Sequence, residues 1–101
     1  MILEIAQFDI KPELTAEFEA NVAKAQPLFA RARGCRSMSL HRSGEVPARY
    51  RLFVHWDTLE NHTVDFRESE DFRAWRALVG HCFASPPHVE HVSEVWSGFR
   101  Q

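Results

Sequence analysis

The sequence has too few cysteines for a disulfide framework. Cys35 and Cys82 are the only two among 101 residues, which excludes the small secreted domains that several cross-links hold together. No apolar run approaches the roughly 20 residues that cross a bilayer. The first residues also lack the basic flank and cleavage site of a secretory signal. We therefore expect a cytoplasmic protein with reduced thiols and no membrane partner.

Clustered positive charge is missing as well. Twelve Lys and Arg stand against 14 Asp and Glu, and both signs are interspersed along the chain. The absence of a basic run or stripe argues against nucleic acid as a partner. A glycine-rich phosphate loop, a flavin fingerprint, an HExxH motif and paired CxxC motifs are absent too. We therefore expect no bound flavin, haem or metal.

The spacing of the histidines near the C-terminus also argues against a metal site. His88 and His91 are three residues apart on an expected strand, so their side chains should face opposite ways. His81 and Cys82 are neighbours at the end of an expected helix, where we expect their side chains to diverge. No set of ligands is therefore predicted to converge here.

What the chain does have is a regular succession of strand and helix patterns. Bulky residues alternate as in strands over four segments, 2–10, 35–42, 49–57 and 88–96. Helical spacing occupies the two segments between them, 13–33 and 58–79, and Pro27 predicts a break near residues 25–27. The order βαββαβ predicts an α+β, ferredoxin-like sandwich with an antiparallel sheet. A single domain should cover residues 1–101, with 97–101 as a flexible tail.

The second helical segment should form the wall of a pocket. It begins after Asp57, where Asp57-x-x-Glu60 resembles a capping box and Thr58 is the alternative cap. A second helix starts at Ser69, and the resulting bend predicts a cavity between helices and sheet. Both apolar rows should face the sheet, namely Leu59-His62-Phe66 and Phe72-Trp75-Val79.

The sheet should also have a partner on its other side. Two helices cover only one face, and we expect the open face to carry Ala6, Phe8 and bulky groups of the third strand. Such a face is too apolar for water. The sequence therefore predicts a homodimer joined sheet to sheet.

Several motifs together resemble one protein family, the antibiotic biosynthesis monooxygenases, which are small dimeric α+β barrel proteins. The motifs are Gly34-Cys-x-x-x-x-Leu40-His41-Arg42-Ser43, Trp56, His62 six residues later, Ser69-x-x-Phe72 and Pro87-x-Val89-Glu90. The resemblance covers nearly the whole chain. It implies a relationship to cofactor-free oxygenases of quinols and polyketide aromatics, to haem-degrading proteins, and to an isomerase of a small phosphorylated compound.

The haem-degrading branch of that family fits this sequence poorly. At the positions where that branch has Asn on the first strand, Trp on the helix and a His ligand in the next helix, this chain has Gln7, Phe66 and Arg76. All three differ, so the resemblance does not extend to haem degradation.

Two residues are candidates for catalysis. His62, whose ordinary pKa lies near 6.5, is suited to accept a proton from a phenol or quinol, although a purely structural histidine would show the same pattern. Arg67 is suited to stabilise the resulting anion, with a surface ion pair as the alternative.

Six further residues are candidates for substrate binding, and for the aromatic ones the alternative is a place in the core. They are Gln7, Arg51, Trp56, Phe66, Phe72 and Trp75. The leading hypothesis is a cofactor-independent monooxygenase acting on a small quinol or polycyclic phenol. The alternatives are a non-enzymatic ligand-binding or stress-associated dimer, and a small-molecule isomerase with His62 as a proton shuttle.

Overall fold

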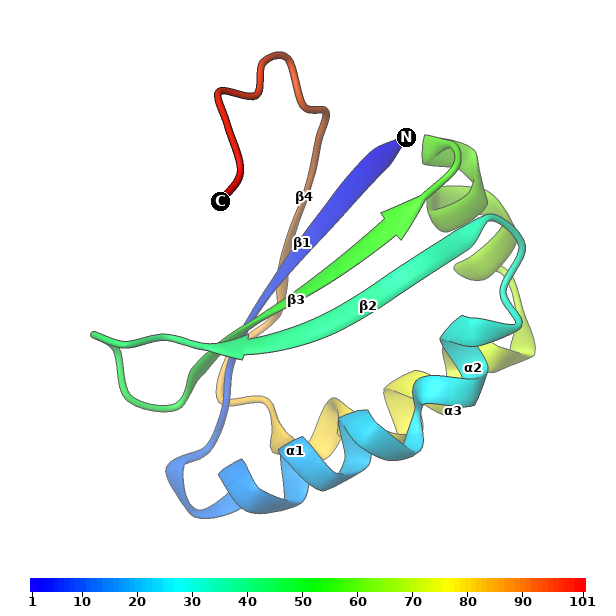
Figure 1. Cartoon of the computed structure of the whole chain (residues 1–101). Helices are drawn as coiled ribbons and strands as arrows, with labels where there is room; N and C mark the ends of the chain where they lie inside the picture. The colour runs from blue at the N-terminus through cyan, green and yellow to red at the C-terminus, as the bar shows by residue number, and fades with distance from the viewer.

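Four strands form one antiparallel sheet, and the helices lie on one side of it (Figure 1). The computed structural model describes all 101 residues. The sheet order is β2-β3-β1-β4, with strands β1 (Ile2–Asp9), β2 (Cys35–Arg42), β3 (Arg49–Trp56) and β4 (His88–Val92). The helices are η1 (Pro12–Leu14), α1 (Thr15–Lys24), α2 (Gln26–Ala30), η2 (Asn61–Phe66), α3 (Glu70–Val79) and η3 (Gly80–Cys82). The expected ferredoxin-like α+β fold is confirmed. None of the helices combines the length and hydropathy that crossing a membrane requires.

The first helical segment is broken where proline predicts. Pro27 lies in the first turn of α2, where its missing N–H costs nothing, and Ala25 joins α2 to the end of α1. The apolar stripe of Phe18, Val22 and Phe29 is buried against the sheet. Gly34, with a φ of 77°, then turns the chain into β2.

The two faces of β1 are the reverse of those we expect for the dimer. Ala6 and Phe8 pair with buried residues of β3 and lie beneath the helices, so they do not form the open face. That face carries Leu3, Ile5 and Phe53 instead. Alternation defines the two rows of a strand, but when both rows are apolar it does not say which row meets the helices.

The last strand is shorter than its sequence pattern. It ends at Val92, which pairs with Leu3, so only one residue of β1, Ile2, remains beyond that point to extend the ladder. The final segment, 93–101, contains no helix or strand, and Figure 1 shows it apart from the helical layer. Trp96 and Phe99 on this segment are largely exposed.

Candidate functional site

A pocket of about 380 Å³ opens between the helices and the β1–β4 side of the sheet. Its lining includes Phe66 and Trp75, on the two sides of the bend between η2 and α3, as the sequence predicts. The aromatic part of the lining is Phe8, Phe29, Phe66, Phe72, Trp75 and Phe83. The charged and titratable residues of the lining are Glu4, His62 and Arg67, and also Arg76, whose guanidinium lies over the ring of Phe83. The pocket is thus an aromatic slot with ionisable groups at one wall.

The helix that carries His62 is wound more widely than an α-helix. In η2 the backbone N–H of Arg67 donates to the carbonyl of His62, which is the i→i+5 bond of a π-helix. His62 and Phe66, four residues apart, both point inward and are buried. Leu59 is 41% exposed, so the expectation that it faces the sheet is wrong. Leu59 lies before the first residue of η2, whereas the two inward-facing residues lie within it.

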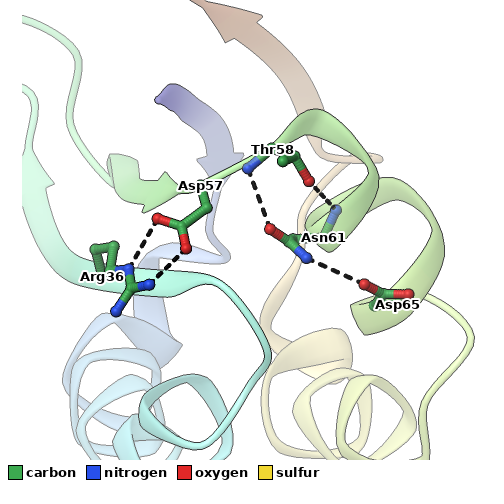
Figure 2. A network of polar contacts seen from close by, with 5 residues as sticks. All are labelled: Arg36, Asp57, Thr58, Asn61 and Asp65. Carbon is green, nitrogen blue, oxygen red and sulfur yellow. Dashed lines mark hydrogen bonds and ion pairs between the residues drawn. The ribbon is translucent and has the colours of Figure 1, made fainter.

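The start of this helix is held by a network of side chains (Figure 2). The Thr58 backbone N–H donates to Asn61 Oδ1 and the Asn61 N–H donates to Thr58 Oγ1, both at 3.1 Å, which makes a reciprocal capping box. Asp57 does not cap the helix, because it accepts two bonds from the guanidinium of Arg36 at 2.8 and 2.5 Å. The predicted box Asp57-x-x-Glu60 is therefore wrong, and Thr58 is the cap.

Asn61 is also held from the side of the sheet. A Cβ atom added at Gly34 would lie 2.1 Å from Asn61 Oδ1, so only glycine leaves room for this side chain. The Asn61 amide in turn donates to Asp65 at 3.1 Å (Figure 2). Because His62 follows Asn61 directly, these contacts set the position from which the imidazole enters the pocket.

A chain of buried polar groups forms the polar wall. Glu4 is 5% exposed and His62 is 3% exposed. The indole N–H of Trp56 donates to Glu4 Oε1 at 3.0 Å, and His62 Nε2 lies 3.4 Å from the same oxygen. His62 Nδ1 and His91 Nε2 are hydrogen-bonded at 2.8 Å. The ring of His62 stacks on Trp56, with centroids 5.2 Å apart.

Burial moves the pKa values of the acid and the base in opposite directions. It raises the pKa of Glu4 to about 7, although the bond from Trp56 and the charge of Arg67 favour the carboxylate. It lowers the pKa of His62 to about 3, and Arg67 and His91 lower it further. The pKa of His91 is lowered as well, first by burial. Near neutral pH, therefore, Glu4 is present in both its protonated and its ionised form. His62 stays neutral and is too weakly basic to serve as a general base.

The structure gathers five of the eight candidate residues at this pocket and separates three. His62, Arg67, Phe66, Phe72 and Trp75 line it. Trp56 is completely buried and does not line the pocket itself. It contacts two residues that do, Glu4 and His62.

Gln7 and Arg51 do not belong to this pocket. They are paired in register on the open face of the sheet, where Arg51 donates to Gln7 Oε1 at 2.8 Å. Their neighbours Ala6 and Leu52 face the helices, so the alternation of the strand directs Gln7 and Arg51 the other way.

Sequence reasoning misses two members of the site, Glu4 and His91. The available signal for Glu4 is an acid in the strand row that also holds Ala6 and Phe8, an unusual residue for a buried row. His91 faces η2 and His88 faces the open side, as their spacing predicts, because their ladder partners are Glu4 and Gln7. The hydrogen bond of His91 to His62 joins two elements that lie 29 positions apart in the chain, so no local sequence pattern predicts it.

Outside the pocket, Glu17, His81 and Cys82 place their ligand atoms within 4.8 Å of one another. His81 contacts the carboxylate of Glu17, and Cys82 Sγ lies 3.5 Å from His81 Nε2. The expectation that His81 and Cys82 diverge is wrong, because η3 is a tight 3-10 turn. The side chains of the two exposed members, Glu17 and His81, are in contact and join α1 to η3.

Fold and site define an α+β, ferredoxin-like protein with an aromatic pocket beneath its helices. The family model described as Antibiotic biosynthesis monooxygenase matches residues 1–78, and the chain belongs to this family. The resemblance seen in the sequence is thereby confirmed.

Relatives match the chain along most of its length. It is 37% identical over 95 residues to the uncharacterized protein YczJ of Bacillus subtilis, covering 94% of this chain and all of that protein. A crystal structure from Bordetella bronchiseptica, named as an antibiotic biosynthesis monooxygenase, shares 57% identity with a TM-score of 0.92, covering 94% and 97% of the two chains. A similarly named crystal structure from Caulobacter crescentus shares 23% identity with a TM-score of 0.81, covering 94% of this chain and 90% of that chain. At this identity the likeness shows the fold alone.

Proposed function

We propose that this protein is a cofactor-independent monooxygenase that acts on a small quinol or polycyclic phenol as a homodimer. The observation that carries the proposal is the aromatic slot with Glu4 and His62 at one wall. We further propose that it acts in the cytoplasm, since both of its cysteines are unpaired.

The pocket suits a flat aromatic ligand. Its volume of about 380 Å³ lies in the range of small-molecule sites. Phe66 and Phe72 stand edge to face, with centroids 5.7 Å apart, and Trp75 is edge to face with Phe29 at 5.1 Å. Rings arranged in this way offer both faces and edges to a bound aromatic ring.

The polar wall suits a phenolic hydroxyl. An ionised phenol or quinol is a stronger reductant than its neutral form and can react directly with dioxygen. Glu4 changes its charge near neutral pH, and Arg67 is an exposed cation at the pocket that forms no salt bridge with a carboxylate of the chain. The site therefore offers both a proton acceptor and a counter-charge for the anion.

The proposal of a homodimer rests on the open face of the sheet. Leu3, Ile5 and Phe53 lie there without a covering helix, and Ile5 stands directly opposite Phe53. A second copy placed against this face would remove the apolar row from water.

Oxygen consumption with a panel of hydroquinones and anthrones, in metal-free buffer, tests the function. We expect uptake that depends on substrate and survives treatment with chelator. Trp75→Ala should reduce it by removing one wall of the slot, whereas Arg73→Ala, on the exposed side of the same helix, should not. Tight binding of the panel without any oxygen uptake would contradict the oxygenase and favour a ligand-binding protein.

A further inference from the structure

We propose that Glu4 is the proton acceptor of this site, and that His62 and His91 are positioning residues that hold its carboxylate toward the pocket. Glu4 takes the proton of a phenolic hydroxyl bound beside it. The inference rests on the proposed function in taking a phenol as the ligand, but it does not require that the phenol react with dioxygen.

The two oxygens of Glu4 have different surroundings. Oε1 accepts the Trp56 indole N–H and lies nearest His62, whereas Oε2 has no hydrogen-bond partner in the chain. Every buried polar side-chain atom of the protein does have a partner. Oε2 is therefore not sealed in the core, and because Glu4 lines the pocket we assign Oε2 as the oxygen that faces it. One oxygen anchors the carboxylate and the other faces the ligand.

The histidine pair orients the anchored oxygen. A hydrogen bond between two neutral imidazoles needs one donor and one acceptor. When His91 Nε2–H donates to His62 Nδ1, the proton of His62 resides on Nε2, which lies 3.4 Å from Glu4 Oε1. In this tautomer, His91 holds the Nε2 proton of His62 toward the carboxylate of Glu4. It acts through His62, since it does not itself line the pocket.

The proposed step moves one proton and no electrons. The O–H bond of the phenol breaks, its electron pair stays on the phenolate oxygen, and a new O–H bond forms at Glu4 Oε2. The single negative charge passes from the buried carboxylate to the ligand, where the guanidinium of Arg67 can face it. The charge of the site as a whole is unchanged, so the transfer needs no ion from solution.

The charged and titratable groups around Glu4 and its pocket come from five elements. His62 and Arg67 belong to η2 and its end, Arg76 to α3, His91 to β4, and Cys35 to β2, with Glu4 itself on β1. Burial, the largest influence, brings the pKa of Glu4 to about 7. The carboxylate needed as acceptor therefore forms as the pH rises through neutrality.

Binding of 4-nitrophenol across neutral to alkaline pH tests the assignment, because its absorbance shows whether the bound form is ionised. With phenolate bound, Glu4 should carry a proton, so each bound phenolate takes up one proton. The Kd of the wild-type protein should then rise about tenfold for each pH unit above the Glu4 midpoint. In Glu4→Gln, which keeps an acceptor for Trp56, the Kd for phenolate should not change with pH.

Two further variants separate the roles. Glu60→Gln removes an exposed carboxylate at the start of the same helical segment and should behave as wild type. His91→Ala should shift the pH at which the Kd begins to rise, whereas a merely structural role would weaken binding equally at every pH. As a direct readout, infrared difference spectra should show a protonated carboxyl group on binding, absent in Glu4→Gln.

The outcomes distinguish this inference from the proposed function. A wild-type Kd that is constant with pH, or that varies in the same way in Glu4→Gln, would overturn the role of Glu4. Undiminished oxygen uptake in Glu4→Gln would overturn it too and leave the oxygenase standing, since loss of a general base costs about 100-fold or more. Proton uptake as described, without oxygen consumption, would support Glu4 and refute the oxygenase.

Discussion

Replacing Glu4 by glutamine should stabilise the folded protein in mildly alkaline solution and leave its stability unchanged in acid. The wild-type carboxylate is buried, and it carries a charge above its folded-state pKa of about 7. The amide that replaces it would be neutral at every pH and would keep an acceptor for the indole of Trp56. The substitution thus removes the charge with little change in shape.

The size of the effect follows from the shift in pKa. The stabilising contribution of neutral Glu4 is fully present below its ordinary pKa of 4.5 and is lost as the pH rises through about 7. The difference between these two pKa values corresponds to roughly 3 kcal/mol. We expect Glu4→Gln to be more stable than wild type by up to that amount at about pH 8, and equal to it at about pH 4.

His62 changes the stability profile in the opposite direction. Its pKa is lowered from 6.5 to about 3, so its neutral form stabilises the protein above 6.5 and this contribution is lost as the pH falls through about 3. Between the ordinary pKa values of Glu4 and His62, the folded wild type holds the proton on Glu4 and the unfolded chain holds it on histidine. The slopes of Glu4 and His62 cancel there, whereas Glu4→Gln should show the rising slope of His62. His91, whose pKa is lowered too, adds the same smaller rise in both proteins.

Urea unfolding at several pH values measures both effects. Wild type and variant are compared at equal protein concentration, because unfolding of the proposed dimer would depend on concentration. The decisive quantity is the difference in unfolding free energy between the two proteins. If Glu4→Gln were less stable than wild type by the same amount in acid and in alkaline solution, burial would not raise the pKa of Glu4. The pKa argument for the site would then be wrong.

Three further predictions concern other parts of the fold. Gly34→Ala should lower the free energy of unfolding by about 2 kcal/mol or more, because Gly34 has a positive φ and a Cβ atom there would collide with Asn61. Gly80→Ala should not destabilise the protein, because Gly80 has a helical φ and open space around it. Urea unfolding compares the two variants. Ile5→Asp should shift the sedimentation coefficient from dimer to monomer, and a wild type that is monomeric at micromolar concentration would contradict the proposed interface. Elemental analysis of the purified protein should find no stoichiometric zinc; zinc that is lost in Cys82→Ser would instead place a metal at that cysteine.

The sequence alone determines the elements and their order. Alternation of bulky residues is a local property, and it predicts β2 with its observed ends, Cys35–Arg42. Pro27 breaks the first helix for a reason internal to its own turn, and Ser69 caps α3 by accepting the N–H of Phe72 three residues later. These features depend on residues within one or two turns of each other, so the pattern along the chain is sufficient to predict them.

Only the tertiary structure decides which of the residues meet. Both rows of β1 are apolar, so which row lies beneath the helices depends on how the helices pack, and that choice buries Phe8 and places Gln7 on the open face of the sheet. The polar wall joins β1, η2 and β4, and its hydrogen bond between His62 and His91 spans 29 positions in the chain. The identity of the acid in this site is set by burial, which raises the pKa of Glu4 and lowers that of His62. Burial is a property of the folded whole, and no spacing along the sequence contains it.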